Sequence, residues 1–452
     1  MSKKTIDMTE GNPLKLITAF TIPMILGNVF QQLYTMVDTM VVGQFVSKDA
    51  LAAVGATGAI LFLMISIIIG FTVGTAIVTA QKAGAKDAEG IRAIFATGFF
   101  IVIIESVALV IIGNIGIRPA LRLLRTPEEI IAHADLYLRI NFCSCVAPIL
   151  YNIVSQFMRS LGDSKTPLYA LIISSVTNIV LDLVFVIFFG MGVAGVAIAT
   201  AIAQAISAIY CLAVTFRHFP EYIPGKGEWK MSRPIVKTIL KFGIPMSLQN
   251  MLVSFGMMFV QSTINGFGTN VVAGFTAGNK LDQIGIQFMN SVGTAASTYT
   301  GQNFGAKKVR RLFEGLKASM IFNFIMTAVL SLTLVLFGKY IVLLFVKSTE
   351  TEVISVAANY LKIVCSFYLL CGISNILQNY LRGINYVAVP TASSIIELVV
   401  KIAVAFGFSY MFGYNGIWWA WPVAWFVTDV FLFGYLFFKA NPAVKKMFSA
   451  QQ

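Results

Sequence analysis

Acidic and polar side chains lie inside stretches of this sequence that are otherwise apolar, and their spacing suggests ion chemistry. Asp38 and Asp182 each lie in such a stretch, and a charged side chain at the middle of a bilayer costs about 2.5 to 3.5 kcal/mol. Asn178 precedes Asp182 by four residues and therefore shares its helix face, and Thr200 lies in the next apolar stretch. If the two acids face one pocket, their mutual repulsion in a medium of low polarity favours uptake of a proton or a small cation by the pair.

The same four residues predict a possible metal-ion site. Carboxylate, amide and hydroxyl oxygens are ligands that suit Na⁺, so H⁺ and Na⁺ both stay open as the bound ion at this stage. The structural alternative is that these side chains only tie helices together, through hydrogen bonds worth about 0.6 to 2 kcal/mol each.

Further polar residues are candidates for the wall of a cavity. Gln31 and Tyr34 share a helix face with Asp38 at i, i+3 and i+7 spacing, and Asn152 offers another amide in a later stretch. Glu397 and Lys401 are four residues apart, which predicts either a structural ion pair or a pair that lines a cavity. Three more acids in apolar stretches have no assigned role: Glu105, Asp282 and Asp429.

Composition defines the elements that must position these side chains. Of 452 residues, 57% are hydrophobic and 12% are charged, which is too apolar for a soluble protein. Each helical crossing of a bilayer needs about 20 residues. The chain can therefore supply twelve membrane-spanning helices, and the lipid bilayer is its expected surrounding. The net charge of +13 is explained by basic residues beside these spans rather than by nucleic-acid binding.

The residue types exclude several other chemistries. The five cysteines form no C-x-x-C motif, the two histidines are too few for a His-based metal site, and no phosphate-binding G-x-x-x-x-G-K-[ST] motif is present. We therefore expect no cofactor, and we expect any transport to use an ion gradient.

The apolar stretches predict an all-α membrane protein in two six-helix halves. We expect an N-terminal lobe at residues 1–216, a hydrophilic cytoplasmic linker at 217–234 and a C-terminal lobe at 235–452. The predicted spans are 14–43, 50–80, 92–116, 135–158, 166–189, 193–216, 235–264, 271–302, 314–346, 353–381, 388–411 and 416–438. When the loops are assigned alternately to two sides, 23 Lys and Arg residues fall on one side and eight on the other. This bias predicts that both termini and the linker are cytoplasmic.

The two halves resemble each other at a nearly constant offset. Ile22-Pro23-Met24 recurs 222 residues later at Ile244-Pro245-Met246, and Gly84-Ala85-Lys86 recurs 221 residues later at Gly305-Ala306-Lys307. Pro167 and Pro390 are 223 apart, and Gly195 and Gly416 are 221 apart. Because each half has an even number of spans, the repeats are parallel, and pseudo-symmetric lobes around a central cavity are the expected architecture.

The repeat also shows divergence and a possible hinge. Lys401 occupies the position that matches Asn178, and Ala405 the position that matches Asp182, so we expect the halves to differ in ion coupling. Pro23 lies inside the first span, where proline kinks a helix, and it is either a hinge or a static bend.

These motifs in order resemble the multidrug and toxic compound extrusion (MATE) family over essentially the whole chain. They are Gly11-Asn12-Pro13, Ile22-Pro23-Met24, Gln31-Gln32-x-Tyr34-x3-Asp38-x4-Gly43, the two Gly-Ala-Lys turns, and Arg159-Ser160-Leu161-Gly162-Asp163-Ser164-x2-Pro167. The positions of Asp38, Asn178, Asp182 and Thr200 are similar to the DinF-like prokaryotic branch, in which the N-terminal lobe takes a proton or Na⁺. The other bacterial branch uses carboxylates in its seventh and tenth spans, and here those spans carry no Asp or Glu between Gly243 and Gly266 or between Asn359 and Leu381.

The resemblance implies a secondary active antiporter that exports small organic, often cationic and amphiphilic, molecules in exchange for H⁺ or Na⁺ by alternating access. It also implies that Asn152 lies among cavity residues and that Pro23 corresponds to a proline that bends the first helix. We expect a monomer. One alternative is a flippase or exporter for a lipid-linked or amphiphilic metabolite. A remote alternative is an intramembrane aspartyl enzyme, which would use an acid pair of the same kind.

Overall fold

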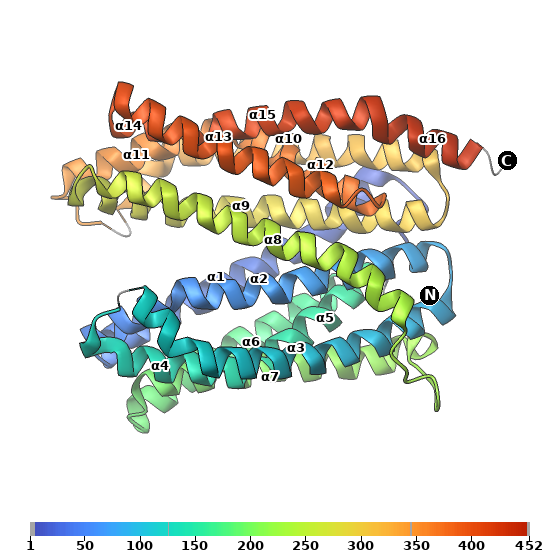
Figure 1. Ribbon diagram of the computed structural model, residues 1–452, viewed down its shortest axis with the longest axis horizontal. Helices are drawn as coiled ribbons and strands as arrows, with labels where there is room; N and C mark the ends of the chain where they lie inside the picture. Colours follow the sequence, from blue (N-terminus) through green and yellow to red (C-terminus); the bar gives the residue numbers. More distant parts are fainter. Residues whose placement is uncertain (1–4, 125, 344–345, 450–452) are drawn as a thin grey trace. The chain divides into compact units, whose positions relative to one another are not determined.

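The computed structural model describes residues 5–124, 126–343 and 346–449, and in this part of the chain the regular structure is entirely helical (Figure 1). Lys3, Lys4 and Arg125, which entered the charge count, lie outside the described residues. The helices are α1 (Pro13–Phe45), α2 (Lys48–Gly84), α3 (Ala88–Leu123), α4 (Glu128–Cys143), α5 (Val146–Ser160), α6 (Lys165–Leu183), η1 (Val184–Phe188), α7 (Gly192–His218), η2 (Pro220–Tyr222), α8 (Arg233–Asn265), α9 (Thr269–Gly305), α10 (Val309–Val342), α11 (Thr351–Ser366), α12 (Tyr368–Gly383), α13 (Ala388–Phe412), α14 (Tyr414–Ile417), α15 (Ala420–Tyr435), η3 (Leu436–Ala440) and α16 (Asn441–Ser449).

The helices account for the twelve predicted spans. Within the described ranges, nine helices are long and apolar enough to cross a membrane, and two bent pairs, α4 with α5 and α11 with α12, raise the number to eleven. The twelfth segment is α9, which is 37 residues long but is interrupted by Asn, Gln, Thr and Ser. Many of these polar residues are buried, so α9 is shielded from lipid by its own unit.

The first two helices of each half have matching lengths. The pair α1 and α8 has 33 residues each, and the pair α2 and α9 has 37 each. Both long helices end in a Gly-Ala-Lys turn whose lysine has a left-handed backbone, with φ of 56° at Lys86 and 58° at Lys307. The parallel repeat predicted from sequence is therefore present in the backbone.

The fourth span of each half is broken rather than continuous. α4 and α5 meet at a bend of 46°, and α11 and α12 at 49°. Pro148 explains the first break, because its ring nitrogen cannot donate to the carbonyl one turn earlier and it disfavours a helical preceding residue. The second break, at Phe367, has no proline, and nothing in the local sequence explains it.

Contacts divide the chain into two compact units. Among the described residues, unit 1 contains those from 5 to 7 and from 22 to 247, and unit 2 contains those from 8 to 21 and from 248 to 449. The unit boundaries fall inside α1 and α8, so each of these helices begins in one unit and continues in the other. The division into lobes at residues 216 and 235 stays a prediction.

Local contacts show why the beginning of α1 belongs to unit 2 and the beginning of α8 belongs to unit 1. In unit 2, the Met8 carbonyl accepts hydrogen bonds from Asn303 at 2.9 Å and from Arg311 at 3.1 Å, which fastens the segment before α1 to the end of α9 and the start of α10. In unit 1, α2 packs against the first part of α8, where a Cβ on Gly70 would lie 2.6 Å from the Gly243 carbonyl oxygen. Glycine is therefore required for this close approach.

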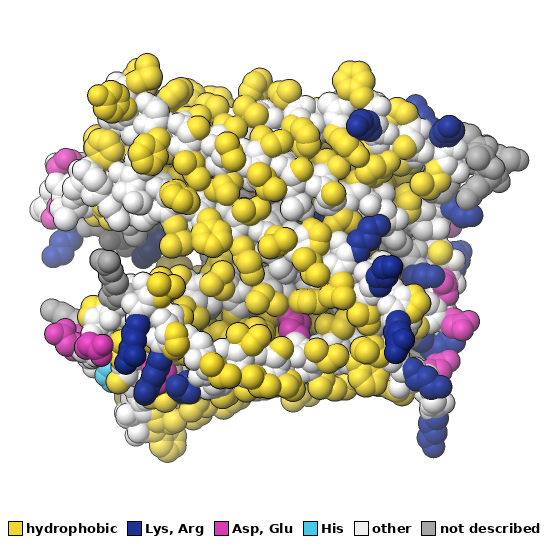
Figure 2. All heavy atoms as spheres, in the orientation of Figure 1, with side chains coloured by type: hydrophobic (Ala, Val, Ile, Leu, Met, Phe, Trp, Pro, Cys, Tyr) yellow, Lys and Arg dark blue, Asp and Glu magenta, His cyan; other side chains and the backbone are white. Residues whose placement is uncertain are grey.

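Apolar side chains cover much of the face that Figure 2 shows, and the lysines and arginines of this face gather near the helix ends. Large apolar residues are strongly exposed along the helices, including Ile115 at 74% and Phe188 at 80%. A soluble protein would bury this surface, whereas lipid tails cover it at no cost. This distribution is that of a multi-span membrane protein.

A short turn between α2 and α3 carries an acidic cap. Asp87 accepts a hydrogen bond from the Gly90 amide at 2.8 Å and contacts Lys82 Nζ at 2.6 Å. The Lys82 ammonium and the Gly90 amide hold the pKa of the Asp87 carboxyl below its usual range. The same turn in unit 2 has Lys308 in place of Asp87, and α10 begins without a side-chain cap.

Candidate functional site

Three helices of unit 1 bring the four predicted ion-site residues together. Asp38 comes from α1, Asn178 and Asp182 from α6, and Thr200 from α7. The Thr200 hydroxyl lies 3.4 Å from Asp38 Oδ2, and the Asn178 amide nitrogen lies 3.5 Å from Thr200 Oγ1. The carboxyl groups of Asp38 and Asp182 interact directly with each other.

Helix α6 is built to hold its two polar residues inside the unit. Its start is capped by Asp163, whose carboxylate accepts from the Thr166 amide at 3.0 Å and the Thr166 hydroxyl at 2.6 Å. Asn178 and Asp182 lie on the inner face and are 1% and 0% exposed. The α-helix gives way to a π-helical turn, Val184–Phe188, directly after this face, a feature that is frequent at functional sites.

The site has more hydrogen-bond acceptors than donors. The single hydroxyl hydrogen of Thr200 also points to the Val196 carbonyl at 3.0 Å, which is the shorter of its two contacts. Four buried oxygens have no hydrogen-bond donor in the described part of the chain: Asp38 Oδ1, Asn178 Oδ1, Asp182 Oδ1 and Asp182 Oδ2. Buried acceptors without donors are costly, so the geometry calls for a proton or a cation among these oxygens.

A second set of polar groups surrounds the acids. Gln31 and Gln204 both hydrogen-bond with Tyr34, with Gln204 Nε2 donating to the Tyr34 hydroxyl at 3.2 Å. Tyr137 of α4 lies close enough to interact electrostatically with both carboxyls. The sequence analysis missed Gln204 and Tyr137. Gln204 could have been found because it follows Thr200 by four residues on the same face of α7.

Two other predicted residues are placed differently. Asn152 is partly buried in α5, where its amide donates to the Pro148 carbonyl at 2.8 Å, so one of its hydrogens is used within its own helix. Pro23 lies inside the continuous helix α1, two residues after Thr21, the last residue of α1 that belongs to unit 2. Neither observation assigns a role to these residues.

Unit 2 has a different polar centre. Lys401 Nζ lies 2.9 Å from Glu397 Oε1, so the two residues form an ion pair, as both sequence-based alternatives require. Asp282, which had no assigned partner in the sequence, is 1% exposed and accepts from the Tyr360 hydroxyl at 2.9 Å and the Tyr368 hydroxyl at 2.7 Å. Asp429 accepts a hydrogen bond from Ser374 at 2.5 Å.

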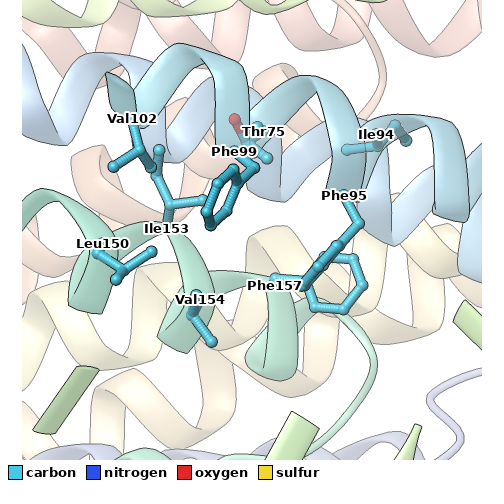
Figure 3. Close-up of a pocket in the computed structure, with 10 residues that line it drawn as sticks. Thr75, Ile94, Phe95, Phe99, Val102, Leu150, Ile153, Val154 and Phe157 are labelled. Atoms are coloured by element: carbon cyan, nitrogen blue, oxygen red, sulfur yellow. The ribbon is translucent and has the colours of Figure 1, made fainter. Parts of the chain in front are cut away.

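Other candidate sites in the described ranges are weaker. No group of three or more His, Cys, Asp or Glu residues there could hold a metal ion. The oxygen set in unit 1 is not such a group, because only two of its four residues are carboxylates. The pocket in Figure 3 lies among α2, α3 and α5, and its side chains, such as Phe95, Phe99 and Phe157, are apolar apart from Thr75. None of the predicted site residues lines it.

Comparison with known proteins identifies the family. The MatE family model matches residues 23–184 and again residues 245–406, so both matches begin and end 222 residues apart. The chain belongs to the MatE family. The double match agrees with the internal repeat, and membership confirms a multi-span membrane transporter and sets the enzyme alternative aside. It does not distinguish the DinF-like branch.

Relatives of this MatE protein match it over most of its length. The probable multidrug resistance protein YpnP of Bacillus subtilis (strain 168) is 32% identical over 384 residues, which cover 84% of each chain. The probable multidrug resistance protein YoeA of the same strain is 32% identical over 432 residues, which cover 93% of this chain and 92% of the relative. A crystal structure described as MATE in the bent conformation has a TM-score of 0.90 at 25% identity and covers 99% of this chain and 100% of that one.

Proposed function

We propose that this MatE protein is a secondary active antiporter that exports organic, cationic amphiphilic compounds in exchange for H⁺ or Na⁺ by alternating access. The names of its relatives support multidrug export. The observation that carries the ion coupling is the excess of acceptors in unit 1, where Asp38 and Asp182 touch and four buried oxygens lack donors. A proton shared by the two carboxyls, or Na⁺ bound by the four oxygens, would satisfy them.

In this proposal, Asn178 and Thr200 complete the ion site, and loading or release of the ion decides which conformation is favoured. An ion that binds one conformation better shifts the equilibrium toward it by its differential affinity. Gln31, Tyr34 and Asn152 of unit 1, and Glu397 and Lys401 of unit 2, are proposed to contact substrate. Tyr34 links the two roles, because it bonds with Gln204 and interacts with the charge of Asp38.

The test is dye uptake into inverted membrane vesicles under separate pH and Na⁺ gradients. We expect Asp38→Asn to reduce ion-driven uptake to the level of vesicles without the protein. Asp49→Asn, which changes an exposed acid in the first turn of α2, serves as the control and should leave uptake unchanged. Normal uptake by Asp38→Asn would refute the ion site, and the gradient that drives the wild type identifies the ion.

Pro23 is proposed as the hinge of α1. Proline leaves the carbonyl four residues earlier without its helical hydrogen bond, and α1 passes from unit 2 to unit 1 at this place. In the same vesicles, Pro23→Ala should slow uptake while ion binding by the purified protein stays intact. Equal uptake rates would show that the bend is static.

The remaining proposals concern topology and assembly. We propose that both termini and the linker at 217–234 are cytoplasmic, in a monomer in the cell membrane. A cysteine introduced into the linker should resist membrane-impermeant thiol reagents in intact cells and react after lysis. Light scattering of the purified protein should give the mass of one chain, and a dimer mass would contradict the monomer.

A further inference from the structure

The ion site of unit 1 has an equivalent position in unit 2. The repeat offsets that relate the two prolines in α1 and α8, the starts of α6 and α13, and the glycines of α7 and α14 also relate the site residues. By these offsets of 222, 223 and 221, the residues equivalent to Asp38, Asn178, Asp182 and Thr200 are Val260, Lys401, Ala405 and Trp421.

The structure of unit 2 supports this correspondence by contacts. In unit 1, Asn178 contacts Thr200, and in unit 2 their equivalents are also in contact, with Lys401 Nζ 5.8 Å from the centre of the Trp421 ring. Val260, Ala405 and Trp421 all belong to one buried hydrophobic cluster and are 0%, 1% and 3% exposed. The position that holds unsatisfied oxygens in unit 1 therefore holds apolar groups and an ammonium in unit 2.

The ammonium of Lys401 has acidic partners that unit 1 lacks. Glu397 Oε1 lies at 2.9 Å, and Asp282 on α9 is close enough to interact electrostatically with Lys401. The equivalents of these acids in unit 1 are Ser174 and Leu61. The lysine and its acids therefore occur together in unit 2, as expected if each stabilises the other in a medium of low polarity.

Other charged and titratable groups also lie around Lys401. Asp282 accepts from the hydroxyls of Tyr360 and Tyr368, and Asp429 Oδ1 accepts from Ser374, whereas Asp429 Oδ2 has no hydrogen-bond donor in the described part of the chain. Cys371 of α12 lies within electrostatic range of Lys401 and of the three acids. The ring of Trp421 adds a cation–π contact to the ammonium.

We propose that Lys401 is a tethered cation that permanently occupies the unit 2 equivalent of the ion site. An ion from solution can leave, whereas an ammonium on a side chain cannot. Unit 2 then exchanges no ion during the cycle, and coupling is carried by unit 1. This inference rests on the proposed function, because it contrasts unit 2 with an exchangeable ion site in unit 1.

The proposal predicts that unit 2 becomes an ion-binding unit when the lysine charge is removed. In Lys401→Gln, Glu397 and Asp282 lose their buried counter-charge, and an unpaired buried charge is strongly destabilising. The protein must then take up about one additional proton or Na⁺ per chain, since one fixed positive charge has been removed. Lys401→Arg keeps the charge and is the matched control.

The experiment counts cations bound by the purified full-length protein, with radioactive Na⁺ in one arm and proton uptake after a pH jump in the other. We expect Lys401→Gln to bind about one cation more than the wild type and Lys401→Arg to bind the same number as the wild type. Equal counts for Lys401→Gln and Lys401→Arg in both arms overturn the proposal. If Lys401→Gln does not fold, the double variant Lys401→Gln/Asp282→Asn decides in its place. It leaves Glu397 without a counter-charge, and it should bind about one cation more than Asp282→Asn alone.

Asp38→Asn separates this proposal from the proposed function. If the wild type binds a cation that Asp38→Asn does not, and Lys401→Gln gains none, the tethered-cation proposal fails and the unit 1 site stands. If Asp38→Asn binds as many cations as the wild type while Lys401→Gln gains one, the unit 1 site fails and the role of Lys401 stands.

Discussion

The ion site of unit 1 and its repeat-equivalent position in unit 2 have opposite electrostatics. In unit 1, Asp38 and Asp182 meet among oxygens that lack donors. In unit 2, Lys401 is paired with Glu397, and Asp282 is held by two tyrosine hydroxyls. An internal repeat can thus preserve the lengths of its first two helices and the turn after the second, while a few buried side chains decide whether a unit needs an ion from solution.

The largest expected effect comes from placing a lysine in the ion site of unit 1, as is found at the equivalent position of unit 2. Asn178→Lys would place an ammonium beside Asp38 and Asp182, where it would form buried ion pairs and displace the exchangeable cation. We expect ion-driven dye uptake in inverted vesicles to be abolished while the purified protein keeps its elution volume in size-exclusion chromatography. Asn178→Gln, which keeps an amide, is the control. Uptake by Asn178→Lys at the wild-type rate would break the comparison.

An intermediate effect tests whether the long helix of each unit depends on a close backbone contact with a neighbouring helix of its own unit. A Cβ on Gly70 of α2 would lie 2.6 Å from the Gly243 carbonyl oxygen, and one on Gly274 of α9 would lie 2.8 Å from the Val353 carbonyl oxygen. We expect Gly70→Ala and Gly274→Ala each to lower the free energy of unfolding by about 1 to 3 kcal/mol, because backbone must move.

The control for this prediction is Gly55→Ala, since a Cβ at this position of α2 meets no atom within 4 Å. Helix propensity then favours alanine by about 1 kcal/mol. Thermal unfolding of the detergent-purified variants measures all three. A large loss at Gly70 with none at Gly274 would show that only unit 1 depends on this close approach.

The smallest effect concerns the turns after α2 and α9. Asp87 caps α3, and Asp87→Ala should cost about 1 kcal/mol at neutral pH. The pKa of Asp87 is lower in the folded protein than in the unfolded chain, so its contribution is complete above the unfolded value of about 4 and is lost as the pH falls through the folded value. Unfolding midpoints at several pH values below neutrality should therefore converge for the wild type and Asp87→Ala. Lys308→Ala in unit 2 should show no such convergence, and a constant difference for Asp87→Ala would contradict the assignment.

Much of the fold could be predicted from local sequence. Apolar stretches of membrane length predicted the spans, and α9 was among them despite its polar residues. The breaks at Ser144 and Phe367 were missed, since an apolar stretch of adequate length gives no sign that its two halves differ in direction by 46° or 49°. Pro148 was a local signal for the first break.

The candidate site was predicted only in part. Helical spacing placed Asn178 and Asp182 on one face, and placed Glu397 next to Lys401. Spacing within one helix says nothing about partners from other helices, so the contacts of Gln204 with Tyr34 and of Asp282 with Tyr360 and Tyr368 were not found.

The sequence by itself determined that this chain is a membrane protein with a parallel repeat, because chain length, apolar runs and recurring turns are properties of local segments. It also determined which polar groups enter the membrane. Only the tertiary structure decided which of them meet. Asp38 and Thr200 are 162 residues apart, and their contact depends on how α1 and α7 are rotated and packed, which many residues set together. At the equivalent positions of the repeat, the same packing leaves unsatisfied oxygens in unit 1 and a paired lysine in unit 2.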